Sequence, residues 1–276
     1  MQNNIKKKLN FVFWGTPDVA SETLEILKKN GYLPSLIVTS PDKPQGRKML
    51  VTPPPVKIWA EKNKIPYIQP KKLVELENIF TTSSDLFIVV AYGKIMPKSI
   101  LNIPQLGSIN VHYSLLPKYR GASPVENAIL NGDTETGVTI QKMAYKMDVG
   151  DIITQENINI MPDETAPELR KRLIKLGGEL LVNTLPKFIK GEITAMPQDE
   201  KLATNCHKIK KEDGLIDLED NALKNYNKFR AYAFWPRTFF FKNGKRIIIT
   251  QAKLENEKFV IERVIPENGK EMDYKN

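Results

Sequence analysis

Short apolar runs alternate with amphipathic stretches over the first two thirds of this chain. The runs predict buried strands at 9–13, 33–39, 86–90, 108–111, 137–143 and 152–160. A helix is predicted over 20–29, and leucines at helical spacing predict a long helix over 164–190, opened by Pro162 or Asp163. Alternating strands and helices are typical of an α/β domain with a mostly parallel, doubly wound sheet.

The pattern changes after Gly191. Polar, turn-rich sequence predicts a linker over 196–208, between a large domain of residues 1–195 and a small domain of residues 209–276. The small domain is expected to hold a helix over 221–231 and strands at 238–242 and 246–251. A β-rich C-terminal module is therefore predicted.

A long loop is predicted over 39–57, between the second strand and the next helix. It contains five prolines, with basic residues at Lys43, Arg47 and Lys48 and few apolar residues. Loops of this length inside a compact domain are usually functional or disordered. We therefore regard it as a candidate binding segment.

Charge is unevenly distributed along the chain. The net charge is +9, made up of +8 over residues 1–72, −4 over 73–200 and +5 over 201–276. A polyanionic partner that touches both ends of the chain would explain this pattern, and so would a lysine-rich solvated surface.

No apolar run is long enough to span a membrane. Because Cys206 is the single cysteine, no internal disulfide can form, which fits the cytoplasm.

Candidate chemistry gathers near one of the two histidines. Asn110 and His112 lie two residues apart at the end of a predicted strand, so their side chains share one face, and parallel strands of this fold bind ligands at that end. An amide beside an imidazole suits a reacting carbonyl, and Asp148 could hold the imidazole. The alternative is a capping asparagine, a structural histidine and a loop aspartate.

Other common site motifs are missing. The sequence contains no Gly-x-Gly-x-x-Gly, Walker A, His-Glu-x-x-His or Gly-x-Ser-x-Gly motif and no cluster of metal ligands, so we expect no metal. The segment from Ser123 to Glu126 predicts a helix start, with Ser123 as N-cap, Pro124 at the first position and Glu126 closing a capping box.

Three segments together resemble the folate-dependent formyltransferases: Asn-Val-His-Tyr-Ser-Leu-Leu-Pro-Lys-Tyr-Arg-Gly-Ala-Ser-Pro (110–124), Thr-Gly-Val-Thr-Ile (136–140) and Met-Asp-Val-Gly-Asp-Ile (147–152). The resemblance implies a Rossmann-like catalytic domain in which Asn110, His112 and Asp148 are the catalytic trio. It also implies a site for the folate carrier at Ser114, Leu115, Leu116, Pro117, Val90, Tyr92 and Gly93.

Four further segments, at 13–17, 40–48, 209–217 and 234–236, resemble the branch of this family whose acceptor is methionyl-initiator tRNA. This resemblance implies 10-formyltetrahydrofolate as co-substrate and initiator methionyl-tRNA as partner of a monomeric enzyme. Lys43, Arg47 and Lys48 would then face the tRNA. The C-terminal domain would be OB-like and tRNA-binding, and it is shorter here than is usual for the family.

Three other functions remain open at this point. An amino-sugar nucleotide could be the acceptor for the same chemistry, although it would not require the basic loop. A non-catalytic RNA-binding protein would have no use for the full trio, and an oxidoreductase would be expected to carry the glycine fingerprint. In the formyltransferase hypothesis, Asn110 and His112 donate hydrogen bonds to the formyl oxygen, and Asp148 holds His112 and accepts the amine proton.

Overall fold

The computed structural model describes residues 9–46, 49–76 and 84–275. The chain folds into two compact units, each made from three segments. Unit 1 consists of Met1–His112, Val138–Glu156 and Ile174–Glu200, and unit 2 consists of Tyr113–Gly137, Asn157–Leu173 and Lys201–Asn276. The domain boundaries predicted at 195 and 208 remain a prediction.

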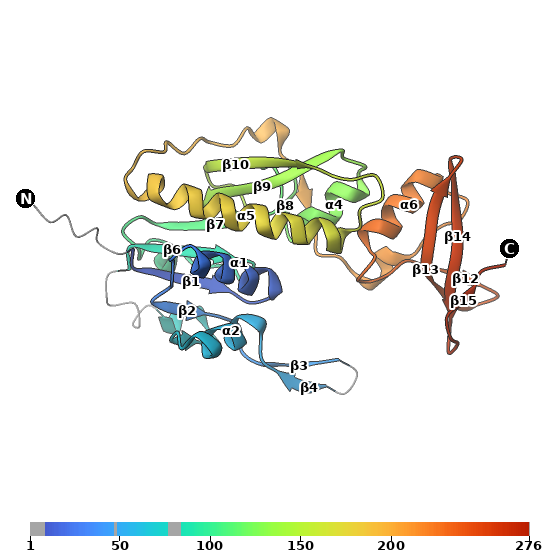
Figure 1. The fold of residues 1–276 in the computed structure, drawn as a ribbon, viewed down its shortest axis with the longest axis horizontal. Helices are drawn as coiled ribbons and strands as arrows, with labels where there is room; N and C mark the ends of the chain where they lie inside the picture. The colour runs from blue at the N-terminus through green and yellow to red at the C-terminus, as the bar shows by residue number, and fades with distance from the viewer. Residues whose placement is uncertain (1–8, 47–48, 77–83, 276) are drawn as a thin grey trace, which may run out of the picture. The chain divides into compact units, whose positions relative to one another are not determined.

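A seven-stranded sheet organises unit 1, in the order β10-β9-β7-β6-β1-β2-β5 (Figure 1). Its strands are β1 (Phe11–Gly15), β2 (Leu36–Val38), β5 (Tyr67–Ile68), β6 (Leu86–Val90), β7 (Ser108–His112), β9 (Glu135–Lys142) and β10 (Ile152–Asn159). The pairs from β5 through β7 are parallel, and β9 runs antiparallel to β7. The predicted α/β class with a mostly parallel sheet is confirmed.

The helices of unit 1 bury apolar faces. They are α1 (Asp18–Lys29), α2 (Pro55–Asn63), α3 (Lys98–Leu101) and most of α5 (Ala166–Ile189). In α1 the buried positions include Ala20, Leu24 and Leu27, which recur at helical spacing. Gly178 of α5 lies directly against the side chain of Ile26, where an added Cβ would not fit. A glycine there lets the two helices approach closely.

Unit 2 contains the C-terminal β-rich module. Its antiparallel sheet has the order β12 (Phe239–Lys242), β13 (Lys245–Glu255), β14 (Lys258–Pro266) and β15 (Met272–Asp273). Helix α6 (Ala222–Ala231) contacts β13 and β14, and α4 (Pro124–Leu130) contacts α6 (Figure 1). Asn256 and Glu257 both have positive φ and form the tight turn between β13 and β14. The predicted module is confirmed.

The segment predicted as a linker, residues 196–208, forms backbone hydrogen bonds with other segments of the chain at two places. Met196 forms an antiparallel bridge with Ile152 in unit 1. In unit 2, β11 (Asn205–Cys206) pairs with β8 (Arg120–Gly121), and Gly121 lies so close that a Cβ there would overlap the Cys206 carbonyl. The stretch is therefore held in place by backbone hydrogen bonds.

Two helix starts differ from their predictions because side chains found other partners. Helix α5 begins at Ala166, since Thr165 donates from its backbone N–H and its hydroxyl to Glu168 Oε2. The prediction of a capping box at the start of α4 is wrong. Pro124 does open that helix, but the Ser123 side chain makes no capping hydrogen bond and Glu126 pairs with Arg170 instead.

The loop predicted over 39–57 contains regular structure. Strands β3 (Lys43–Gln45) and β4 (Leu50–Thr52) form an antiparallel hairpin, and α2 begins at Pro55. At the base of the hairpin, Gln69 and then Lys57 donate to the Asp42 carboxylate, and these hydrogen bonds lower the pKa of Asp42. The hairpin is thus tied to unit 1 at its base.

Candidate active site

Strand β7 presents the two predicted polar side chains at the carboxyl end of the parallel sheet. Asn110 lies opposite Gln141 of β9 in the strand register, and His112 lies opposite Thr139. Asn110 is half-buried and His112 is buried. Because the two positions are two residues apart on one strand, they project to the same face, as predicted.

Asp148 reaches His112 from the segment between β9 and β10. Its Oδ1 lies 3.6 Å from His112 Nδ1, and its side chain is mostly buried. The Asp148 backbone is left-handed, with φ of 54°, a region that aspartate tolerates better than most residues. At 3.6 Å the two atoms face each other but are too far apart for a hydrogen bond. The predicted pairing of His112 and Asp148 is present in the structure.

Two glutamines that the sequence did not single out hold Asp148. The buried side chain of Gln141 donates from Nε2 to Asp148 Oδ1 at 2.9 Å. Gln198 donates from Nε2 to the backbone oxygens of Asp148, at 2.9 Å, and Gly150, at 2.7 Å. One amide therefore fixes the carboxylate and the other fixes the left-handed backbone. The strand pattern could have indicated Gln141, since it faces Asn110, but Gln198 is 50 residues from Asp148.

Gly150 allows the segment to turn tightly beside β9. A Cβ at this position would overlap the carbonyl oxygen of Lys142. The neighbouring chain is bonded to β9 as well, because Lys142 donates its N–H to the carbonyl of Asp151 at 2.9 Å. The absence of a side chain at Gly150 therefore sets where Asp148 lies.

The first predicted folate segment follows β6. Val90 ends the strand and is fully buried, whereas Ala91 and Gly93 are exposed and have positive φ. The Tyr92 ring lies in the core of unit 1, edge-on to Trp14 with ring centroids 5.3 Å apart, and burial raises the pKa of Tyr92 to about 12. A ligand here would therefore meet the exposed backbone of Ala91 and Gly93 rather than the Tyr92 ring.

The second predicted folate segment directly follows β7. Ser114 is fully buried, and its hydroxyl donates to the Lys118 carbonyl at 2.6 Å. Leu116 is buried, while Leu115 and Pro117 are half-buried. The apolar side chains thus remain partly accessible on a turn that Ser114 holds from within.

Of the three predicted tRNA-binding residues, the structure describes Lys43, which is exposed at the start of β3. Arg47 and Lys48 lie outside the described residues. The same hairpin carries exposed apolar side chains at Met49, Leu50 and Val51. Sequence reasoning stressed the charge of this segment and missed its apolar tip.

The described residues contain neither a cluster of metal ligands nor a membrane-spanning helix. No group of three or more histidine, cysteine, aspartate or glutamate side chains in residues 9–46, 49–76 and 84–275 could hold a metal ion. In the same ranges, no helix is both long and apolar enough to cross a bilayer.

Comparisons with known proteins identify the family of this chain. The formyl transferase model matches residues 7–185, and the model of the formyl transferase C-terminal domain matches residues 208–273. Among solved structures, the N-formyltransferase of Helicobacter canadensis, in complex with folinic acid and dTDP-3-aminofucose, has a TM-score of 0.70 at 21% identity, covering 90% of this chain and 89% of that one. The methionyl-tRNA formyltransferase of Clostridium thermocellum has a TM-score of 0.62 at 17% identity, covering 96% and 100%.

Relatives found by sequence are more similar to this chain than these solved structures are. The methionyl-tRNA formyltransferase of Halalkalibacterium halodurans is 44% identical over 248 residues, which cover 89% of this chain and 78% of the relative. That of Thermotoga maritima is 46% identical over 231 residues, covering 83% and 74%. With both domain models matched and relatives this similar over most of its length, the chain belongs to the formyl transferase family, among the methionyl-tRNA formyltransferases.

Proposed function

We propose that this protein transfers the formyl group of 10-formyltetrahydrofolate to the α-amino group of methionyl-initiator tRNA. The observation that carries the proposal is the His112–Asp148 pair beside Asn110 at the carboxyl end of β7, in a chain of this family. Curated relatives that carry the name methionyl-tRNA formyltransferase support the acceptor. We expect the enzyme to act in the cytoplasm as a monomer.

The acceptor amine must lose a proton to form the new amide. A free α-amino group titrates near ~8, so much of it is protonated at neutral pH. Asp148 is the acceptor that we assign to this proton, received directly or through one water. As the new C–N bond forms and the bond from the formyl carbon to the carrier nitrogen breaks, the amine loses one proton and the carrier nitrogen gains one.

Asn110 and His112 stabilise the charge that develops on the formyl oxygen. The Asn110 amide is a donor, and His112 donates from the ring nitrogen that does not face Asp148. Each such donor typically contributes ~10²-fold or more to the rate. Asp148 thus has a second role, since its position beside Nδ1 orients the imidazole.

The folate carrier supplies the formyl carbon and a leaving nitrogen. We assign its binding to the backbone of the segment that includes Val90, Tyr92 and Gly93 after β6, and to the turn from Ser114 to Pro117. Exposed backbone at Ala91 and Gly93 suits the hydrogen-bonding edge of a flat ring, and the half-buried Leu115 and Pro117 suit its apolar face. The donor and acceptor groups present are therefore of the kinds that a pterin requires.

The test of the proposal is a transfer assay with two kinds of acceptor. Formyl transfer from 10-formyltetrahydrofolate is measured to methionyl-initiator tRNA and, in parallel, to a panel of amino-sugar nucleotides. We expect product with the tRNA only. Transfer to a sugar would keep the trio and its chemistry but contradict the assigned acceptor, and transfer to neither would contradict the function.

The β3–β4 hairpin is proposed to contact the tRNA, with Lys43, Arg47 and Lys48 on phosphates. Phosphate contacts release counterions, so the slope of log KM against log salt should fall by roughly 0.7 to 0.9 per contact removed. Lys43→Gln should therefore flatten the slope by about this amount. Lys190→Gln, which removes an exposed lysine paired with Glu192, is the matched control and should leave the slope unchanged. An equal slope in Lys43→Gln and wild type would remove Lys43 from the interface.

Gln141 is proposed as a positioning residue for Asp148. Gln141→Leu removes the 2.9 Å hydrogen bond to Asp148 Oδ1. Because a lost hydrogen bond to a charged group costs roughly 1.5–3 kcal/mol, we expect kcat to fall by about 10- to 100-fold, with KM for both substrates unchanged. Gln141→Glu sets a second carboxylate beside Asp148, and like charges favour protonation. The acid limb of its pH–rate profile should therefore move to higher pH. A purely structural role would lower stability without moving that limb.

A further inference from the structure

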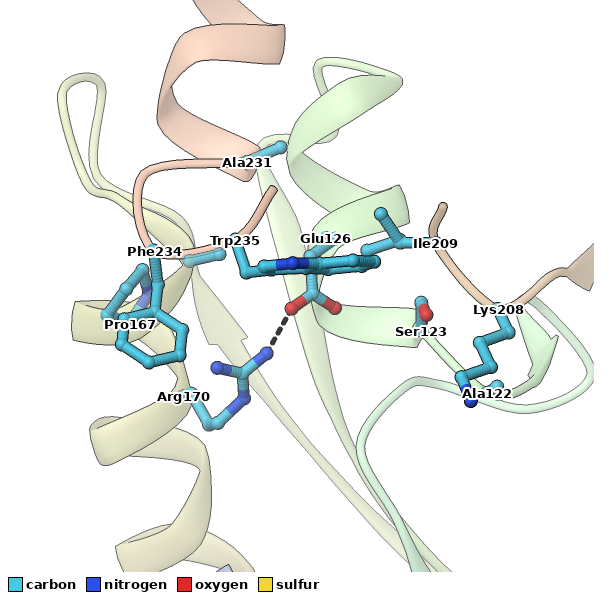
Figure 2. A pocket seen from close by; sticks show the side chains of 11 residues that line it. Ala122, Ser123, Glu126, Pro167, Arg170, Lys208, Ile209, Ala231, Phe234 and Trp235 are labelled. Atoms are coloured by element: carbon cyan, nitrogen blue, oxygen red, sulfur yellow. Dashed lines mark hydrogen bonds and ion pairs between the residues drawn. The ribbon is translucent and has the colours of Figure 1, made fainter. Parts of the chain in front are cut away.

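Unit 2 contains a cavity of about 250 Å³ that lies outside the trio and the folate segments. Six of the residues that line it are Ser123, Glu126, Arg170, Lys208, Phe234 and Trp235. Figure 2 shows Phe234 and Arg170 toward one side of the cavity, Ser123 and Lys208 toward the other, and the Trp235 ring and Glu126 carboxylate between them.

Two aromatic residues that line this cavity, consecutive in the sequence, have solvent-exposed side chains. Phe234 is 78% exposed and Trp235 is 49% exposed, whereas Trp14 and Trp59 are buried. Large aromatic side chains that are left exposed near one another are unfavourable for a free surface and mark interaction sites. Flat rings at the mouth of a small cavity are the feature that proteins use to stack unpaired nucleobases.

The floor of the cavity carries hydrogen-bonding groups of both kinds. Arg170 forms an ion pair with Glu126 Oε1, and the Glu126 side chain is mostly buried while that of Arg170 is about one-third exposed. A carboxylate can accept about four hydrogen bonds, so a single guanidinium contact leaves it able to accept from a ligand. The floor therefore offers an acceptor and a donor next to each other, under the indole.

We propose that this cavity binds an unpaired adenine or cytosine from the single-stranded end of the RNA acceptor, the two bases whose Watson–Crick edge sets an exocyclic amino group beside a ring-nitrogen acceptor; in guanine the neighbouring ring nitrogen is a donor, which would face Arg170. The inference rests on the proposed function, because it takes RNA as the substrate. The base stacks on the Trp235 indole, with Phe234 at the side of the cavity, its amino group donates to Glu126, and the adjacent ring nitrogen accepts from Arg170. Lys208, at the rim, is placed for the attached phosphate.

Base selectivity follows from the buried carboxylate. Adenine and cytosine each present an N–H₂ donor, while uracil presents a carbonyl oxygen at the corresponding position. A carbonyl that faced Glu126 would leave two acceptors opposed in a desolvated site, which costs binding free energy. AMP and CMP should therefore bind in preference to UMP.

Tryptophan fluorescence gives a direct test, because Trp235 is the one of three tryptophans that is substantially exposed. The full chain is titrated with AMP, CMP and UMP. We expect saturable quenching by AMP and CMP, with UMP requiring at least a roughly tenfold higher concentration, since a wrong base edge costs ~1–3 kcal/mol. Glu126→Gln should reduce this preference, because a neutral amide can either donate or accept. Equal quenching by all three nucleotides, or none, would overturn the proposal.

Kinetics with the complete substrate provide the second measurement. Trp235→Leu should raise KM for methionyl-initiator tRNA roughly tenfold, the usual loss of one stacked base, while kcat and KM for the folate stay near wild type. Phe241→Leu, at an exposed aromatic that does not line the cavity, is the matched control and should leave all three unchanged. An unaltered KM in Trp235→Leu would contradict the site even where the enzyme formylates tRNA normally. Absence of tRNA formylation by the wild-type protein would instead contradict the proposed function. In that case the nucleotide titration would still show whether the cavity binds adenine and cytosine.

Discussion

Replacing Asp148 by asparagine should lower kcat for formyl transfer by about 1,000-fold, within the range typical of a lost proton acceptor. Asparagine has the same shape and can still accept the Gln141 hydrogen bond through its oxygen, so the fold should be kept. It cannot take the proton of the attacking amine, and it no longer presents a carboxylate to His112 Nδ1. Single-turnover transfer gives the rate, and folate binding, measured separately, should stay close to that of wild type.

Asp151→Asn is the matched control for this substitution. It removes a carboxylate from the same segment, three residues further along, at a side chain that is half-buried and outside the trio. We expect its single-turnover rate to remain within about threefold of wild type, because Asp151 is assigned no proton to accept and substitutions away from special structural features change stability by only about 0.5 kcal/mol. A fast Asp148→Asn enzyme would show that Asp148 is not the proton acceptor.

Gly150→Ala should reduce kcat by about 100-fold, because a displacement of ~1 Å in a catalytic group can cost that much. The new methyl group would overlap the backbone oxygen of Lys142, which belongs to β9 and cannot rotate away as a side chain could. The segment that bears Asp148 must therefore move. That movement also strains the two hydrogen bonds that Gln198 donates, so thermal stability should fall as well.

Gly31→Ala separates this effect from the general cost of adding a methyl group to a glycine. Gly31 has φ of +83° at the end of α1 and open space around it. We expect the substitution to cost about 1 kcal/mol of stability, the usual penalty for a left-handed alanine, without affecting kcat. If Gly150→Ala behaves like Gly31→Ala in both measurements, the position of Asp148 does not depend on Gly150.

Local pattern was sufficient for most of the fold. The strand predicted at 86–90 is β6, and the predicted strand at 108–111 is β7, which extends one residue further. Such strands are continuous apolar runs because both faces of a parallel sheet are buried. The leucine spacing of α5 likewise reports one buried helix face, and it was recognisable without any knowledge of its neighbours.

Helix ends and turns were predicted less well, because competing partners decide them. Ser123, Pro124 and Glu126 satisfy the sequence rule for a capping box, yet Glu126 pairs with Arg170, which is 44 residues away in sequence. The proline-rich stretch at 39–57 was predicted to be a loop, because proline disfavours the hydrogen-bonded pairing of strands. In the structure, β3 and β4 nevertheless pair within it, with Pro44 opposite Val51.

The α/β class could be predicted from the sequence alone, as could the position of Asn110 and His112 two residues apart on one strand, and the sequence motifs pointed to Asp148. These features depend on residues close together in the chain or on a motif with fixed order. The folded chain was needed to show that Gln141 and Gln198 hold Asp148, and that one cavity is lined by Phe234, Trp235, Glu126 and Arg170. Such contacts join residues tens of positions apart, and they exist only after the burial of apolar surface has brought those segments together.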